Sequence, residues 1–123
     1  MDGDLNAVLA ALSAIRLPAA PTELEIHALV AAALRDGGFA VSHEVRLGPR
    51  CRIDFMVGAI GLEIKKGRPQ RAALMRQAAR YLAQPGVEAL VLVVERSAVL
   101  PGAIGGKPVV VYGLNRLWGV ALP

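Results

Sequence analysis

The sequence predicts an α/β domain in which a mixed central β-sheet is flanked by helices. Two amphipathic helical patterns come first, at 5–15 and 22–36. The hydrophobic period then shortens from that of a helix to that of a strand over 41–66. A further helical pattern at 69–83 precedes the apolar run 89–94, and a strand after such a helix implies a parallel crossover. These changes of period indicate one domain that spans the whole chain, 1–123.

The first part of the chain predicts two helices with recognisable ends. Asp4 can cap a helix over residues 5–15. Thr22 begins the second helix, and Glu25, three residues later, completes a capping box. Gly37 ends this helix, because glycine is the commonest residue just past a helix C-terminus.

A pair of antiparallel strands carries the charged residues of most interest. Taking Ala59 and Ile60 as a two-residue turn places Asp54 opposite Lys65. Because side chains alternate along a strand, Asp54, Glu63 and Lys65 share one face. The apolar residues of the two strands are expected on the other face: Ile53, Phe55, Val57, Leu62 and Ile64.

The second half of the chain predicts a helix followed by buried strands. Pro69 suits the first position of a helix that runs to Ala83. The run 89–94 is almost wholly apolar, as in a strand that is buried on both faces. A further strand is expected at 109–112, within a C-terminal strand and tail at 107–123.

Composition limits the function classes. Hydrophobic residues make up 54% of the 123 residues, so we expect a folded domain, and a homodimer ahead of a monomer. The single cysteine, Cys51, excludes an internal disulfide and is expected to be a buried strand residue. No uncharged apolar run reaches the roughly 18 residues of a membrane span, and no secretory signal is visible. We therefore expect a cytoplasmic protein without a membrane partner.

The charge distribution favours a nucleic-acid partner. Lysine and arginine number 14 against 10 acids, for a net charge of +4. Six basic residues fall in a stretch from Lys65 to Arg80 that contains no acid. Besides Lys65, those expected to contact phosphates are Lys66, Arg68, Arg71, Arg76 and Arg80.

Two carboxylates beside a lysine can support phosphodiester hydrolysis. Asp54 and Glu63 on one sheet face could hold one Mg²⁺, which prefers oxygen ligands. Lys65, next to them, could orient an attacking water or balance charge on the phosphorane. The alternative is a cross-strand ion pair on a solvated face, which contributes little to stability.

The spacing Asp-x8-Glu-x-Lys, from Asp54 to Lys65, resembles the PD-(D/E)XK nuclease superfamily. Gln77 and Tyr81, on the helix that follows, resemble the Gln-x3-Tyr element of its RecB-type members. The resemblance covers about 22–95 and implies a restriction-endonuclease-like core of αβββαβ order. It departs from the family pattern at Ile53, where a proline is usual.

The resemblance also implies roles for residues of the site. Asp54, Glu63 and the carbonyl of Ile64 would bind Mg²⁺ or Mn²⁺, and Lys65 would be catalytic. An acid from the preceding helix often completes such a site, and Glu23 is preferred here because it lies beside the apolar stripe of its helix. Glu25, which already has a capping role, is the competitor. Gln77 and Tyr81 would reach the site or the DNA backbone.

The expected function is therefore a magnesium-dependent nuclease acting on DNA ahead of RNA. A structure-selective junction resolvase of the same fold and a non-catalytic nucleic-acid-binding module are the alternatives. The two histidines, His27 and His43, have no metal-binding partner at recognised spacing and are expected to be structural.

Overall fold

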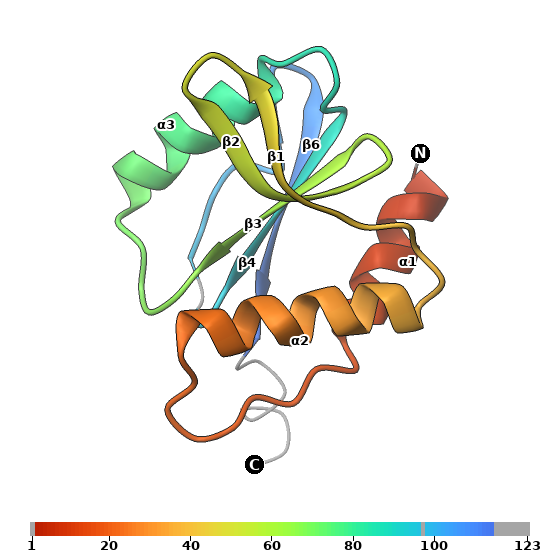
Figure 1. Ribbon diagram of the computed structural model, residues 1–123. Coiled ribbons are helices and arrows are strands. Elements are labelled where there is room, and N and C mark those ends of the chain that lie inside the picture. Colours follow the sequence, from red (N-terminus) through yellow and green to blue (C-terminus); the bar gives the residue numbers. More distant parts are fainter. Residues whose placement is uncertain (1, 97, 115–123) are drawn as a thin grey trace.

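A six-stranded mixed sheet separates two layers of helix in the computed structural model, which describes residues 2–96 and 98–114 (Figure 1). The helices are α1 (Asp2–Leu12), α2 (Glu23–Asp36) and α3 (Arg71–Leu82). The strands are β1 (Ser42–Gly48), β2 (Cys51–Val57), β3 (Ile60–Lys65), β4 (Ala89–Val94), β5 (Ala103–Ile104) and β6 (Lys107–Gly113). Helices α1 and α2 cover one face of the sheet, and α3 covers the other. The predicted α/β class with a mixed sheet is confirmed.

The strand order is β1-β2-β3-β4-β6-β5. Strands β1, β2 and β3 form an antiparallel meander, and β3, β4 and β6 are parallel. Every residue of β4 is buried, as expected for a strand with helices on both faces. Its parallel pairing with β3 confirms the predicted crossover through α3.

Helix α2 has the predicted ends. The Thr22 side chain accepts a hydrogen bond from the Glu25 N–H, and the Glu25 carboxylate accepts one from the Thr22 N–H. The capping box satisfies two donors that the first turn leaves without helical partners. Gly37 is the C-cap.

The predicted bounds of the other helices need correction. Helix α1 begins at Asp2, so Asp4 lies inside it, and it ends at Leu12 because the chain then tightens into hydrogen bonds between residues three apart. Helix α3 begins at Arg71 rather than at Pro69. Gln70 has an extended backbone with ψ of 130°, which separates the proline from the helix.

The sheet contains one strand that the sequence did not predict. The two-residue strand β5 pairs with β6 across Gly105 and Gly106, both of which have positive φ. A strand this short has no detectable alternation. The predicted strand at 109–112 lies within β6, and the expected tail beyond residue 114 lies outside the described residues.

Two hydrophobic clusters lie on opposite faces of the sheet, and near the middle of β2 the alternation of its side chains between these faces is interrupted. Phe55 packs with α1 and α2, whereas Ile53 packs with α3, so the prediction that both share one face is wrong. Glu44, on β1, has a left-handed backbone with φ of 53° between the pairs that β1 makes with Phe55 and Ile53. This irregularity breaks the regular alternation of side chains. Cys51 is buried in the α3 cluster, as predicted.

Ile53 occupies space left by a glycine on the neighbouring strand. A Cβ added to Gly61 would lie 2.6 Å from Cδ1 of Ile53 and 3.4 Å from the sulfur of Met56. Glycine at this position therefore permits Ile53 to cross to the α3 face. Within the described residues, no helix has the length and apolar character needed to cross a membrane.

Candidate functional site

The candidate site lies where β2 and β3 stop pairing. The last paired residues are Phe55 and Leu62, which are the sequence neighbours of Asp54 and Glu63. The Asp54 N–H donates to Oε1 of Glu63 over 3.1 Å, and the Ile64 N–H donates to Oδ2 of Asp54 over 2.8 Å. Each carboxylate thus accepts a bond that a strand carbonyl would otherwise accept. The two side chains are fixed against one another at the divergence of the strands.

The turn between these strands lies one residue earlier than predicted. Gly58 and Ala59 form it, and Ile60 already belongs to β3. Gly58 has φ of 57°, a left-handed conformation that tight hairpins require and that β-branched isoleucine avoids. The register is shifted by two residues, so Asp54 lies across from Glu63 and not from the lysine two residues later.

Glu63 is the one buried charged residue in the described part of the chain, with 8% of its surface exposed. Burial first, and the negative charge of Asp54 second, raise its pKa from 4.5 to about 7. Lys65 opposes the increase with its ammonium, which lies 3.8 Å from Oε2 of Glu63. The raised pKa shows that this lysine does not offset burial and the neighbouring carboxylate.

Helix α3 supports Glu63 from one side. Gln77 donates from Nε2 to Oε2 of Glu63 over 3.1 Å and to the hydroxyl of Tyr81 over 2.9 Å. The Tyr81 hydroxyl donates in turn to the carbonyl of Arg52 over 3.1 Å. Burial raises the pKa of Tyr81, so its hydroxyl stays protonated and able to donate. Gln77 and Tyr81 therefore reach the site, one of the two roles expected for them.

Helix α2 approaches Asp54 from the other side through a histidine. Nε2 of His27 lies 3.7 Å from Oδ2 of Asp54 and 3.8 Å from Oε2 of Glu23. Glu23 is largely exposed and reaches Asp54 only through this histidine. Glu25 is occupied in the capping box with Thr22.

The position of His27 was not anticipated from the sequence. Its separation of four residues from Glu23 puts both on one helical face, which is the signal that could have linked it to the site. His27 also lies near His43 and Phe55, with ring centroids 5.8 and 5.7 Å away, respectively. His43 stacks on Phe55 at 4.7 Å, which fits the structural role predicted for it. The three rings thus form one group, and His27 is the member that lies against Asp54.

The carbonyl of Ile64, an expected metal ligand, is on the side of β3 that faces β2 and Asp54. The N–H and C=O of one strand residue point to the same side, and the Ile64 N–H points to Asp54. Across the described residues, no group of three or more histidine, cysteine or acidic side chains could hold a metal ion. A cation at this position would depend on the two carboxylates, this carbonyl and water.

The basic residues expected to contact phosphates differ in whether their side chains already have partners within the protein. Lys66 lies 3.9 Å from Glu95, and Arg71 donates to the carbonyl of Val99 over 3.1 Å. The three other side chains of this set form no hydrogen bond or ion pair with any described residue: Arg68, Arg76 and Arg80.

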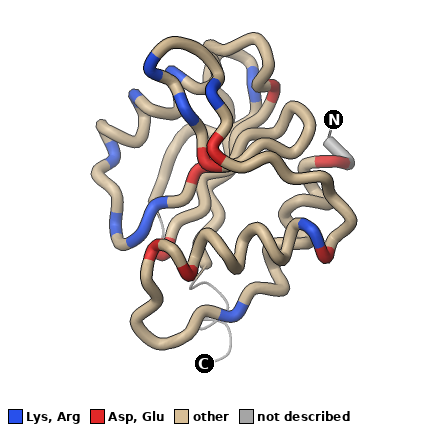
Figure 2. Tube along the Cα trace, in the orientation of Figure 1, with Lys and Arg blue, Asp and Glu red and all other residues tan. Residues whose placement is uncertain are grey.

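A second basic group, which the sequence analysis missed, lies on the β1–β2 hairpin. Arg46, Arg50 and Arg52 line a pocket together with Arg80 of α3. Figure 2 shows basic positions along this hairpin and α3, around acidic positions close to where the strands cross. The hairpin is distant in sequence from α3, so no local pattern relates its arginines to the site.

Comparison of the chain with protein-family models, with curated proteins and with solved structures found no match. What the site can do is therefore inferred from the chemistry of its own side chains.

Proposed function

We propose that the chain is a magnesium-dependent nuclease of the PD-(D/E)XK superfamily that hydrolyses phosphodiester bonds in DNA. The observation that carries this proposal is the arrangement of Asp54 and Glu63, interlocked across β2 and β3 with Lys65 beside them. The order of elements from α2 to β4 agrees with the restriction-endonuclease-like αβββαβ core. A solvated cross-strand ion pair would not require a glutamate as buried as Glu63.

The donor set of the site fits a hard divalent cation. Asp54 and Glu63 supply carboxylate oxygens close to the Ile64 carbonyl, and Mg²⁺ prefers oxygen ligands and retains several waters. A cation there would also relieve the repulsion that raises the pKa of Glu63. When bound, Mg²⁺ or Mn²⁺ supplies Lewis-acid stabilisation of a phosphate and a water of lowered pKa.

The protein's own groups would orient the reaction. Lys65 projects its ammonium beside Glu63, where it can hydrogen-bond a water or stabilise negative charge that develops on the phosphate. Gln77 donates to Oε2 of Glu63 and is itself held by Tyr81, so the Glu63 carboxylate is fixed in one orientation. His27 lies against Asp54 and limits the directions that this carboxylate can take.

The test is cleavage of labelled single-stranded, duplex and four-way-junction DNA, and of RNA, with Mg²⁺, with Mn²⁺ and with EDTA. We expect metal-dependent cleavage of DNA that is lost in both Asp54→Asn and Lys65→Ala. Loss in both variants excludes a contaminating nuclease. Preference for the junction would identify a resolvase, and preference for RNA would correct the substrate.

A metal-binding measurement provides a readout independent of turnover. We expect Mg²⁺ to raise the melting temperature of the wild-type protein and to have less effect on Asp54→Asn, because binding to the folded state alone stabilises it. Glu44→Gln, which removes an exposed acid from β1, is the matched control. Absence of both cleavage and a magnesium-dependent shift in the wild type would contradict the proposal. Nucleic-acid binding without either would indicate the non-catalytic module.

A further inference from the structure

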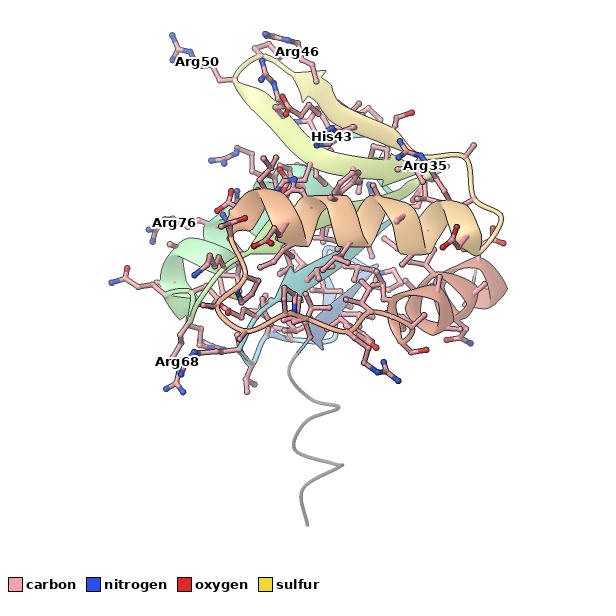
Figure 3. All side chains as sticks on the ribbon, turned by 60° about the horizontal axis from the view of Figure 1, so that its bottom comes forward. Arg35, His43, Arg46, Arg50, Arg68 and Arg76 are labelled. Carbon is pink, nitrogen blue, oxygen red and sulfur yellow. The ribbon has the colours of Figure 1, made fainter. Side chains whose placement is uncertain are left out.

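A pocket of about 360 Å³ opens between the β1–β2 hairpin and α3, next to the candidate site. Four of its lining residues are arginines, Arg46, Arg50, Arg52 and Arg80, and Glu63 forms part of its wall. In Figure 3, Arg46 and Arg50 project from the free end of the hairpin. The pocket thus brings together cations from two elements that are distant in the sequence.

The positive charge of this pocket is largely uncompensated. Arg52 lies 3.5 Å from Glu44 in an exposed ion pair, which is weak. Within the described part of the chain, no acid pairs with Arg46, Arg50 or Arg80. Guanidinium groups repel one another when they gather without an anion. The arrangement therefore favours a bound anion.

Contacts between the hairpin and α3 hold the two sides of the pocket in place. The Tyr81 hydroxyl of α3 donates to the carbonyl of Arg52 on β2. At the hairpin turn, a Cβ added to Gly48 would lie 2.9 Å from the side-chain oxygen of Gln84, which follows α3. The backbone of the pocket is thus preorganised, so that only the arginine side chains must order when a ligand binds.

The anion best suited to this pocket is a phosphate. A guanidinium can donate two parallel hydrogen bonds to phosphate oxygens, which a lysine cannot do. Glu63, Gln77 and Tyr81 line the pocket and also belong to the candidate site, so a phosphate bound there would adjoin the carboxylates. Successive phosphates of one strand could then occupy the pocket and the site.

We propose that the pocket formed by Arg46, Arg50, Arg52 and Arg80 binds a phosphate of the nucleic-acid strand next to the bond that is cut. This inference rests on the proposed nuclease function and adds the path of the substrate to it. The strand runs over the β1–β2 hairpin and the C-terminal half of α3. Arg71, at the start of α3, is already engaged with Val99 and lies off this path.

The test is the affinity of the full chain for a fluorescein-labelled single-stranded DNA in EDTA, which prevents cleavage, measured by fluorescence anisotropy. We expect Arg46→Ala and Arg50→Ala each to raise the Kd about tenfold, because each removes a charge-assisted hydrogen bond. Each should also reduce the slope of log Kd against log salt by about 0.7. Arg35→Ala, an exposed arginine at the end of α2 outside the pocket, should leave both quantities unchanged.

The oligonucleotide is used with a 5′-phosphate and with a 5′-hydroxyl, and inorganic phosphate serves as a competitor. Equal losses for both oligonucleotides identify an internal phosphodiester, and a loss confined to the first identifies a terminal phosphate. Thermal melting confirms that the variants are folded. The inference would be overturned if Arg46→Ala and Arg50→Ala kept the affinity and salt slope of the wild type. It would also be overturned if the wild type did not bind the DNA. Arginine-dependent binding without metal-dependent cleavage would keep the pocket as a phosphate site but refute the nuclease function, and with it the placement beside a bond that is cut.

Discussion

Replacing Glu63 with glutamine should remove a loss of stability that the metal-free protein undergoes as the pH rises. The pKa of Glu63 is raised from 4.5 to about 7 in the folded state, mainly by burial. Between these values the unfolded chain releases the proton and the folded chain retains it. The free energy of unfolding therefore falls as the pH rises through this window, and stays lower above it.

The size of this effect follows from the size of the shift. One pKa unit corresponds to about 1.4 kcal/mol, so a rise from 4.5 to about 7 costs the folded state about 3 kcal/mol once Glu63 is ionised. A glutamine cannot ionise, and its carbonyl oxygen can still accept the hydrogen bond from the Asp54 N–H. Its amide would face Nε2 of Gln77, a penalty that does not change with pH and cancels when one protein is compared at two pH values.

The assay is urea denaturation in EDTA, followed by circular dichroism below pH 4.5 and above pH 7. We expect the wild type to lose about 3 kcal/mol more than Glu63→Gln between the two conditions. Glu88→Gln, which removes an exposed acid just before β4, should behave as the wild type does. Equal pH dependence in the wild type and Glu63→Gln would refute the assignment of a raised pKa to this residue.

Three further substitutions test the packing and the support of the site. Gly61→Ala should destabilise the protein by about 1–3 kcal/mol in urea denaturation, because the new methyl group meets Ile53, whereas Gly86→Ala has open space and should not. Thr22→Ala should cost about 1 kcal/mol in the same assay, since the capping box of α2 loses its side-chain acceptor, and an unchanged midpoint would contradict that role. Tyr81→Phe removes the acceptor that orients Gln77 and should weaken Mg²⁺ affinity about tenfold in a thermal-shift titration. An unchanged affinity would mean that Gln77 is positioned without Tyr81.

Features that depend on local sequence were predictable from the sequence. The capping box of α2 involves residues only three apart, Thr22 and Glu25. The burial of β4 follows from its own uninterrupted apolar run. The apposition of Asp54 and Glu63 needed only a tight turn between two strands, and an error of two residues in register still left them on neighbouring strands.

Features that depend on long-range contacts were not predictable in the same way. Ile53 packs on the α3 face beside the irregular part of β1 at Glu44, and no alternation of hydrophobic residues in the sequence predicts this change of face. His27 approaches Asp54 only because α2 packs across β2. The pocket beside the site likewise requires the hairpin to meet α3, an approach fixed by the tertiary fold.

The irregular backbone of β1 has a consequence for self-association. Within the described residues, β1 pairs only with β2, so its outer edge has no strand partner. A regular exposed edge is a template for strand addition between chains, the first step towards aggregation. The left-handed Glu44 and the register shift between Arg46 and Gly48 interrupt this edge, and the opposite edge is the two-residue β5. These two edges are therefore poorly suited to pair with a second copy of the chain into a continuous sheet.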